Sequence, residues 1–323
     1  MKIKVYKTFE IKEEWWSQIA DGFNACFEGH HATKEHMKET YKSNVFGFCY
    51  HTLAFDGEKI GGFNTWTPCR YCYGNEEIII GLSGSSYVLR EYRKDIMVFA
   101  DMVSVFKEYA HREGIVASIG VSNKNSYKYA KIFCGAKDIM PLSYWVLPIK
   151  VGNVVHKSFL NPLSYFFSVL SIGFNNIVSV FFNNKVKQAL CRIKVDVEFL
   201  HKRLRNDKYF KMEDGKYFYS YTVYDEDGIK CAYIMCAYEN GVASYRALVK
   251  CVKRIFFHER VDMIMLVGTL RMKQSLLIRV PKKHEPKLLP LSIVYIDESD
   301  EEKYHLLKYG ENWDFTLINF DVR

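Results

Sequence analysis

The hydrophobic pattern of the chain changes its period several times near the amino terminus. Residues 2–5 alternate between lysine and an aliphatic side chain, and this period of two predicts a β-strand. Between residues 13 and 27 apolar side chains recur every three or four positions and a glycine follows, so we expect a helix there. Thr33 can cap a second, short helix that ends near residue 41.

Two strands are then predicted around Asp56-Gly57, because this dipeptide favours the tight turn of a β-hairpin. The segments that follow alternate between apolar runs and helical spacing. In order, we expect a strand at 77–90, a helix at 96–112, a strand at 115–123, a helix at 125–135 and a strand at 140–149. The expected order of elements in this part of the chain is therefore β-α-α-β-β-β-α-β-α-β.

The last third of the chain repeats part of this order. A second hairpin is predicted around Asp227-Gly228, followed by a helix at 247–258 and a buried strand at 261–268. The same succession of hairpin, helix and strand indicates two related domains, although the copies share negligible sequence identity. The expected organisation is a first domain at 1–150, a helical linker at 151–210 and a second domain at 211–323.

The carboxyl-terminal segment 311–323 is rich in aromatic residues, and its pattern predicts a final strand. The side chains expected to pack inward are Trp313, Phe315, Leu317 and Phe320. This segment therefore has an expected structural role and no expected chemistry.

The segment between the two predicted domains has an unusual pattern. No charged residue occurs from Ser158 to Asn184, and most positions are Phe, Leu, Ile or Val. Its polar residues fall three or four positions apart, at Ser164, Ser168, Ser171, Asn175, Ser179 and Asn183. This spacing predicts a helix with one narrow polar stripe on an otherwise apolar surface. The next segment, Lys185 to Lys211, is basic, with nine Lys and Arg against three Asp and Glu.

Three placements of this helix are compatible with its pattern. It can be buried between the domains, with the stripe toward solvent or a partner helix. It can instead lie in a membrane surface, with the basic segment against anionic head groups. Its uncharged length also fits a membrane span of roughly 20 residues. Asn175, Asn176 and the serines make the spanning placement the least favoured.

Composition and charge narrow the function classes. The hydrophobic share of 49% and the charged share of 25% are those of a globular protein. Nine cysteines without a framework spacing indicate reduced thiols and a cytoplasmic protein. The pair Cys69 and Cys72 lacks a second pair at zinc spacing, so we expect no metal site. The charged amino terminus is unlike a signal peptide, and the net charge of +8 comes without a DNA-reading motif, so DNA binding is not expected.

The element order of residues 1–150 resembles that of the GNAT acyltransferase superfamily. The similarity includes a long strand ending in SSYVLREYR, a further strand ending at Asn123, and a helix with Ser126 near its start and Gly135 after it. The resemblance implies an α/β (α+β) fold with a mixed sheet, the acyl-CoA N-acyltransferase fold, in two tandem copies joined by a helical linker. The tandem arrangement is also similar to the peptidoglycan aminoacyl transferases of the FemABX type.

Members of this superfamily bind acyl-CoA where two central strands separate, so the resemblance implies acetyl-CoA or another acyl-CoA as co-substrate. The pantetheine would follow the fourth strand at Tyr87, Val88 and Leu89. The pyrophosphate would lie at the start of the next helix, where free amides and the helix dipole favour an anion. The other residues implied for this site are Arg93, Lys94, Ile96, Met97, Val98, Asn123 and Ser126.

The chain departs from the family pattern at the phosphate loop. The family has Arg or Gln, two residues, Gly, one residue, and Gly or Ala. This chain keeps Arg93 but has Ile96 and Val98 at the glycine positions, where glycine would let backbone amides approach the phosphates. Asp95 can in addition cap the helix, and its negative charge repels a pyrophosphate. Neighbouring cations can offset this repulsion.

Acyl transfer to an amine needs a base for the amine and an acid for the leaving thiolate. The family often has a Tyr seven residues after the Asn, a position that is Ala130 here, so the neighbouring Tyr129 is the candidate acid. Glu76 and Glu77 on the central strand are candidate bases, and His51 on the adjacent strand and Ser85 or Ser86 are alternatives. The alternative is that Tyr129 is a packing aromatic and His51 a core residue.

Three functions remain open from the sequence. The first is an N-acyltransferase that moves an acetyl or other acyl group from acyl-CoA to a primary amine of a small molecule, an amino sugar or a peptide. The second is an aminoacyl transferase of the FemABX type that does not use CoA. The third is a non-catalytic binding module with this fold. We expect a cytoplasmic protein, either free or in peripheral contact with a membrane through Ser158–Asn184 and the basic segment. The oligomeric state is not indicated.

Overall fold

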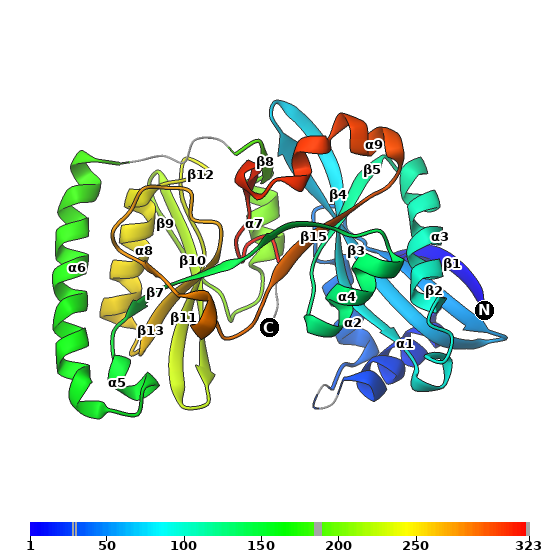
Figure 1. The fold of residues 1–323 in the computed structure, drawn as a ribbon, viewed down its shortest axis with the longest axis horizontal. Coiled ribbons are helices and arrows are strands. Elements are labelled where there is room, and N and C mark those ends of the chain that lie inside the picture. Colours follow the sequence, from blue (N-terminus) through cyan, green and yellow to red (C-terminus); the bar gives the residue numbers. More distant parts are fainter. Residues whose placement is uncertain (28, 30, 184–188, 321–323) are drawn as a thin grey trace. The chain divides into compact units, whose positions relative to one another are not determined.

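Two β-sheets organise the chain, one in each of two structural units (Figure 1). The computed structural model describes residues 1–27, 29, 31–183 and 189–320. Unit 1 consists of Met1–Pro141 and Leu289–Asn312, and unit 2 of Leu142–Leu288 and Trp313–Arg323. Each unit therefore contains residues from both halves of the chain.

The sheet of unit 1 is mixed. β4 (Glu76–Val88) and β5 (Ile115–Val121) run parallel, while the other neighbouring strands of this unit are antiparallel. The strands lie in the order β1 (Lys2–Lys7), β2 (Tyr50–Asp56), β3 (Lys59–Tyr73), β4, β5, β15 (Pro290–Tyr295) and β6 (Lys137–Pro141). The predicted hairpin is confirmed, because Asp56-Gly57 begins the turn between β2 and β3 and Gly57 has a φ of 59°.

Helices cover both faces of this sheet. α1 (Glu13–Cys26) and α2 (Lys34–Lys42) pack on one face, where Trp16 and Phe63 belong to the same buried cluster. α3 (Val98–Arg112) packs on the other face, where the Phe106 ring stacks on Trp66 with a centroid distance of 3.7 Å. Both faces of the central strands are therefore apolar, which explains their nearly continuous hydrophobic runs.

Short elements complete unit 1. Thr33 caps α2 as predicted, because its hydroxyl accepts a hydrogen bond from the His36 amide at 3.2 Å. The other elements are η1 (Thr8–Glu10), η2 (Arg90–Tyr92), α4 (Lys124–Phe133), α9 (Glu298–Lys303), η5 (His305–Lys308) and η6 (Gly310–Asn312). The predicted order of helices and strands is confirmed up to β6.

The strand predicted at 140–149 is divided between the two units. β6 ends at Pro141, and β7 (Ser143–Pro148) continues into unit 2, where it pairs with β13 (Met263–Gly268). In return, β15 from the last part of the chain pairs with β5 and β6 of unit 1. The units therefore differ from the predicted ranges 1–150, 151–210 and 211–323. Local patterns do not reveal this exchange, because strand partners are selected by packing between residues far apart in the sequence.

The sheet of unit 2 repeats the central arrangement of unit 1. Its strands lie in the order β14 (Ile278–Arg279), β7, β13, β11 (Ile229–Glu239), β10 (Tyr217–Glu226) and β9 (Phe210–Asp214). The predicted hairpin joins β10 to β11 at Asp227-Gly228. α8 (Tyr245–His258) then leads to β13, which runs parallel to β11. The order of hairpin, helix and parallel strand matches that of β3, β4, α3 and β5.

The predicted linker helix is α6 (Asn161–Phe181), which belongs to unit 2 and packs against α8. Residues 185–188, with which the predicted basic segment begins, lie outside the described residues. The other elements of unit 2 are α5 (Val151–Val154), η3 (Ser158–Leu160), β8 (Cys191–Ile193), α7 (Val197–Arg203), β12 (Val242–Ala243), η4 (Lys282–His284) and β16 (Trp313–Asp314).

The final strand is much shorter than predicted. β16 spans Trp313–Asp314 and pairs in parallel with β8, and the residues that follow turn instead of extending. All four side chains expected to face inward are nevertheless buried, namely Trp313, Phe315, Leu317 and Phe320. The apolar content of the tail thus predicted its burial but not its backbone conformation.

Candidate functional site

The central parallel strands of unit 1 separate part of the way along their length. β4 and β5 pair from Ile79 opposite Ile115 to Leu82 opposite Ile119. Beyond that point β4 continues from Ser83 to Val88 beside β3, and in the described part of the chain no strand pairs with its other edge. We name this place the first strand fork: Ser83–Val88 of β4, the end of β5, and the start of α3.

A β-bulge explains why the strands separate. Asn64 is opposite Ser86 and Trp66 is opposite Ser83, so Gly84 and Ser85 together face the single residue between Asn64 and Trp66. A bulge of this kind bends the strand and increases its local twist, which turns β4 away from β5. The bulge lies between β3 and β4, whose pairing the sequence did not predict, and its position has no clear sequence pattern.

The start of α3 has its amides partly engaged. Asp95 accepts a hydrogen bond from the Met97 amide at 3.0 Å, and the Ala100 amide donates to the Tyr129 hydroxyl at 3.2 Å. Met97 is the N-cap residue and provides no side-chain cap. Asp95 thus accepts a hydrogen bond near the helix start, as predicted. The donor is the amide of the N-cap residue Met97. An anion at this helix start would meet fewer free amides than a glycine loop offers.

The two residues at the family's glycine positions have different environments. Ile96 is exposed, whereas Val98 is buried with Ala54 and Met102 in a small core cluster beneath α3. Val98 therefore has a packing role that a glycine could not fill. Met97, between them, is largely exposed.

Arg93 is held against the end of β4. Its Nε donates to the Val88 carbonyl oxygen at 2.7 Å, and its Nη2 lies 3.3 Å from the Cys26 sulfur. Lys94 is exposed beside it. The structure therefore places two of the predicted donor-binding cations at the first strand fork.

Two other predicted donor-binding residues are engaged with the rest of unit 1. The Tyr87 ring is buried on the α1 side, and its hydroxyl donates to the Ile19 carbonyl at 3.2 Å. The Leu89 amide donates to the Gly61 carbonyl at 2.8 Å. Their backbone can line the fork, but the Tyr87 side chain faces away toward α1.

Asn123 and Ser126 form the start of α4. The Asn123 side-chain oxygen accepts from the Ser126 amide at 3.0 Å, which is the geometry of a helix cap. Gly135 follows the helix with a φ of 69°, as the resemblance implied. The structure thus gives the two predicted residues a clear structural role next to the end of β5.

Tyr129, the predicted acid, connects α4 to the start of α3. Its hydroxyl accepts from the Ala100 amide and donates to the Ile96 carbonyl oxygen. Its ring packs against Phe99 and Phe133. Burial raises the pKa of the Tyr129 hydroxyl. Its role as an acid stays a prediction, and the observed bonds provide a structural role at the same place.

His51, a predicted base, is completely buried in unit 1. One ring nitrogen is 2.9 Å from the Thr8 hydroxyl and the other is hydrogen bonded to the Thr65 hydroxyl. The ring stacks on Phe63. Burial lowers the pKa of His51 to about 3, so the imidazole is neutral at physiological pH. These are the features of a core histidine.

Glu77, another predicted base, lies at the opposite end of β4. It pairs with Cys72 across the β3–β4 hairpin, and its carboxylate is 3.7 Å from Arg70 Nε. At about 3.3 Å per residue, the eleven positions from Glu77 to Val88 span roughly 35 Å. The structure therefore does not bring Glu77 together with Tyr129 or with the end of β4.

A chain of hydrogen-bonded polar side chains reaches the fork. It includes Tyr41, which the sequence did not indicate as a site residue. The Tyr41 hydroxyl of α2 is hydrogen bonded to Thr65 and to Ser85 of the bulge. Thr65 continues to His51, and His51 to Thr8. The buried polar chain is thus Ser85, Tyr41, Thr65, His51 and Thr8. These residues are too far apart in sequence for any spacing to indicate their contact.

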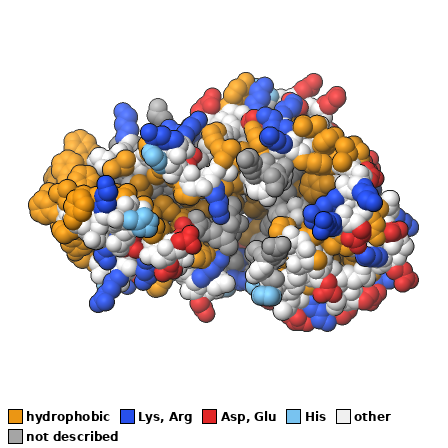
Figure 2. All heavy atoms as spheres, turned by 60° about the horizontal axis from the view of Figure 1, so that its bottom comes forward, with side chains coloured by type: hydrophobic (Ala, Val, Ile, Leu, Met, Phe, Trp, Pro, Cys, Tyr) orange, Lys and Arg blue, Asp and Glu red, His pale blue; other side chains and the backbone are white. Residues whose placement is uncertain are grey.

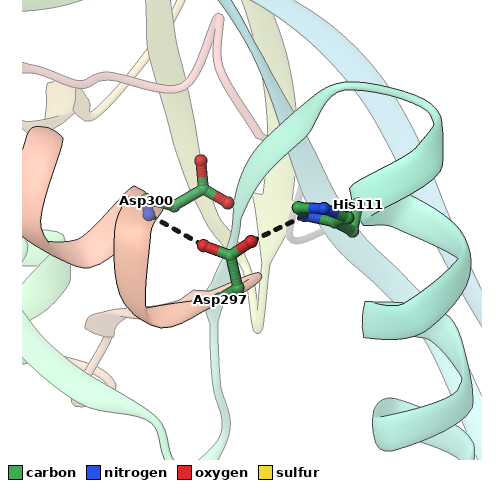
Figure 3. A group of neighbouring side chains, drawn as sticks. All are labelled: His111, Asp297 and Asp300. Atoms are coloured by element: carbon green, nitrogen blue, oxygen red, sulfur yellow. Dashed lines mark hydrogen bonds and ion pairs between the residues drawn. The ribbon is translucent and has the colours of Figure 1, made fainter.

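A cluster with metal-ligand chemistry lies elsewhere in unit 1 (Figure 3). Asp297 accepts from the Asp300 amide at 2.9 Å and lies 2.6 Å from His111 Nδ1. The hydrogen bond from the Asp300 amide is the main cause of the lowered pKa of the Asp297 carboxyl group. Asp297 is the N-cap of α9, so capping and its contact with α3 account for the arrangement.

Unit 2 has an equivalent strand separation, but the tail of the chain fills it. β11 and β13 pair from Cys231 to Ile234, after which β11 continues to Glu239. The Thr316 hydroxyl lies 3.4 Å from the Met235 carbonyl of β11, and Thr316 bridges to Gly268 at the end of β13. We name this the second strand fork.

Gly268 is required for this close packing of the tail. Its φ is 127°, and a Cβ there would lie 2.2 Å from the Phe315 carbonyl oxygen. Phe315 itself is fully buried. The second strand fork is thus occupied by the protein's own residues, whereas the described residues show no such segment inserted in the first.

Comparison with known proteins shows the fold. No family model and no curated protein matches the chain. Three similar solved structures each match 93% of it. One is a conserved protein of unknown function from Enterococcus faecalis described as "Probable N-Acyltransferase", at 9% identity and a TM-score of 0.59 over 74% of that chain. The second is a GCN5-related N-acetyltransferase from Anabaena variabilis, at 10% identity and a TM-score of 0.59 over 74% of its length.

The third structure is a GCN5-related N-acetyltransferase from Kribbella flavida, at 10% identity and a TM-score of 0.56 over 73% of its length. The predicted fold class is confirmed, because the chain has two mixed sheets and matches acyltransferase folds over both units. Identities this low establish the fold alone.

Proposed function

We propose that this protein is an N-acyltransferase of the GNAT type that transfers an acyl group from acyl-CoA to a primary amine, with the reaction in unit 1. The observation that carries this proposal is the first strand fork. There β4 leaves β5, and Arg93 and Lys94 lie at the end of the released strand. The second strand fork contains the tail, so unit 2 is assigned a structural role.

The residues of the fork fit an acyl-CoA donor in part. The released edge of β4 offers backbone groups for an extended amide-containing chain. The cations Arg93 and Lys94 fit a pyrophosphate. The start of α3 fits it less well, because Met97 and Ala100 have their amides engaged and Val98 is part of the core. Phosphate recognition would therefore rest on side-chain charge and be sensitive to salt.

The chemistry requires that the amine nitrogen form a bond to the acyl carbon while the carbon–sulfur bond breaks. The amine proton goes to a base, and the CoA thiolate leaves and takes up a proton. Ser85 places a hydroxyl at the bulge, and the buried polar chain holds it through Tyr41. Since His51 remains neutral and weakly basic, we assign it to orientation of this chain and not to proton removal.

The test is calorimetric titration of the unmodified protein with CoA and acetyl-CoA at low and moderate salt. We expect binding that weakens as salt is added. Asp95→Asn keeps an acceptor for the Met97 amide but removes a charge, so it should tighten CoA binding by about two- to fivefold at low salt. Asp21→Asn, at an exposed position of α1, is the matched control and should have no effect.

Absence of binding at millimolar CoA would overturn the proposal. It would favour the alternatives that need no CoA, an aminoacyl transferase of the FemABX type or a non-catalytic module, which the engaged helix start also favours. If CoA binds, a screen of small amines, amino sugars and peptides with acetyl-CoA follows. We also propose a cytoplasmic location, because the nine cysteines lack the spacing of a disulfide framework.

A further inference from the structure

Helix α6 of unit 2 has its polar stripe inside and its apolar surface outside. The buried residues of the stripe are Ser164, Ser168, Asn175 and Ser179. The Ser164 hydroxyl donates to the Ile149 carbonyl and the Ser168 hydroxyl to the Pro148 carbonyl, both at 2.9 Å. These bonds attach α6 to the end of β7. The stripe therefore packs against other elements of unit 2, whereas the predicted burial of the helix is not observed, because its apolar faces are exposed.

The stripe is also bonded to α8 and to the loop after β13. The Asn175 side-chain oxygen accepts from the hydroxyls of Tyr245 and Ser275. After the carboxyl-terminal end of the helix, the Asn183 side chain donates to the Glu239 carboxylate at 2.6 Å. The buried side chains of the stripe are therefore hydrogen bonded within unit 2, and these bonds fix the orientation of α6.

The outward face of α6 is almost entirely apolar. Each of its large side chains is between 41% and 76% exposed, and they are Leu163, Tyr165, Phe166, Phe167, Val169, Leu170, Phe174, Ile177, Val180 and Phe181. At 3.6 residues per turn they occupy more than half of the helix circumference. Figure 2 shows hydrophobic side chains gathered at the α6 end, on the left, with Lys and Arg nearby. We name this surface the α6 apolar face.

A basic groove lies beside this face. It has a volume of about 400 Å³ and runs between α6 and α8. Its cationic lining comes from Arg246, Lys250, Lys253 and Arg254 of α8, with His258 at the end. Lys250 is paired with Asp214 at 2.6 Å, while within the described residues Arg246, Lys253 and Arg254 form no ion pair. The groove therefore has a net positive charge next to an uncharged apolar surface.

We propose that the α6 apolar face inserts into the surface of a lipid bilayer and that the basic groove on α8 contacts the phosphates of anionic lipids. A large exposed apolar area with flanking cations is the pattern of an interfacial helix. Each cation near an anionic surface adds to the attraction. This inference is independent of the proposed acyl transfer.

A second copy of the chain is a poorer occupant of this face. A twofold dimer brings the same surface of both partners together. The basic grooves beside the two α6 helices would then approach each other, and like charges would oppose the contact. An apolar face that extends over more than half of a helix also exceeds the narrow seam that two helices share.

A membrane-spanning role for α6 conflicts with its bonds. Among the described residues, one helix, Ser158–Phe181, is long and apolar enough to span. Spanning would remove Ser164, Ser168 and Asn175 from their partners and place them in hydrocarbon without hydrogen bonds. It would also leave Tyr245 of α8 without its acceptor. The interfacial placement keeps every one of these bonds.

Vesicle flotation tests the proposal with the full chain. Vesicles of phosphatidylcholine with phosphatidylglycerol should bind the protein, and vesicles of phosphatidylcholine alone should bind it more weakly. Phe174→Ser removes a side chain that is 61% exposed on the face and should reduce binding by about tenfold. Phe9→Ser, at a position of unit 1 that is 67% exposed, is the matched control and should bind like the unmodified protein.

A second pair of variants tests the groove. Lys253→Gln should reduce binding to anionic vesicles severalfold and leave binding to neutral vesicles unchanged, whereas Lys2→Gln in unit 1 should change neither. Circular dichroism of each variant confirms that it is folded.

Two outcomes would overturn the proposal. One is a protein that ignores vesicles but forms a dimer that Phe174→Ser dissociates in analytical ultracentrifugation, because a second copy would then cover the face. The other is a protein that resists extraction from membranes by alkaline carbonate, because α6 would then span the bilayer.

Discussion

Individual residues of unit 1 have structural contacts at positions where the sequence resemblance implied a binding or catalytic role. Val98 stands where the GNAT pattern has glycine, and its side chain fills a core cluster with Ala54 and Met102. Tyr129 stands next to the expected position of an acid, and its hydroxyl ties the start of α3 to α4. The residue types were visible in the sequence, but the groups they contact were not, since those contacts join separate elements.

His51 provides a prediction at this scale through its titration. Its pKa in the folded state is about 3, while an unfolded histidine titrates near 6.5. Between these values the unfolded chain binds a proton that the folded chain does not. This contribution to stability is complete above pH 6.5 and is lost as the pH falls, by up to about 1.4 kcal/mol per pH unit.

Urea unfolding between pH 4.5 and 7.5 measures this effect. His51→Gln should flatten the fall of the unfolding free energy at acid pH, even though it lowers stability at neutral pH. The exposed His36→Gln variant should keep the slope of the unmodified protein. Equal slopes for His51→Gln and the unmodified protein would mean that His51 takes up a proton in the folded state.

At the scale of elements, α6 and the strand forks depend on contacts that periodicity does not specify. The spacing of serines and asparagines predicted the helix and its stripe, and both are present. The pattern did not decide which face is buried, because a hydrogen-bonded polar stripe can pack against β7 and α8 as well as face water. The bulge that opens the first strand fork likewise results from a shift in the pairing register between β3 and β4, which the periodicity of either strand does not specify.

Asn175 and Asn176 give a matched test of the buried stripe. Asn175→Leu should lower the free energy of unfolding by about 1–3 kcal/mol, because the hydroxyls of Tyr245 and Ser275 lose their shared acceptor in a buried site. Asn176→Leu, at the exposed neighbouring position, should change it by less than about 0.5 kcal/mol. Denaturant titration of both variants checks the prediction, and equal losses would show that α6 is not fixed by its stripe.

The whole molecule differs most from the sequence-based prediction, because the two units exchange strands. β7 follows β6 directly in the chain but lies in the other sheet, and β15 returns from the last part of the chain to lie between β5 and β6. The repeat predicted two related units, but no boundary in the sequence marks this exchange. A first domain made of residues 1–150 alone would lack β15, the strand that lies between β5 and β6.

The exchange predicts which fragments fold. Pro141 and Pro290 are directly opposite each other, so a short Asn-Gly turn can join residues 1–141 to 290–312. This fused chain should unfold cooperatively, while the fragment 1–150, without β15, should not. Circular dichroism during urea titration distinguishes the two. Cooperative unfolding of the fragment 1–150 would show that β15 is dispensable for unit 1.

The sequence by itself determined most elements of this protein and their order, including both Asp-Gly hairpins, the uncharged helix and the burial of the aromatic tail. These properties follow from side-chain periodicity and turn chemistry, which act between near neighbours in the chain. Only the tertiary structure decided the strand exchange, the opening of the first strand fork, the filling of the second by Phe315 and Thr316, and the outward apolar face of α6. Each of these results from hydrogen bonding and packing between segments far apart in the sequence, and such contacts exist only once the chain has folded.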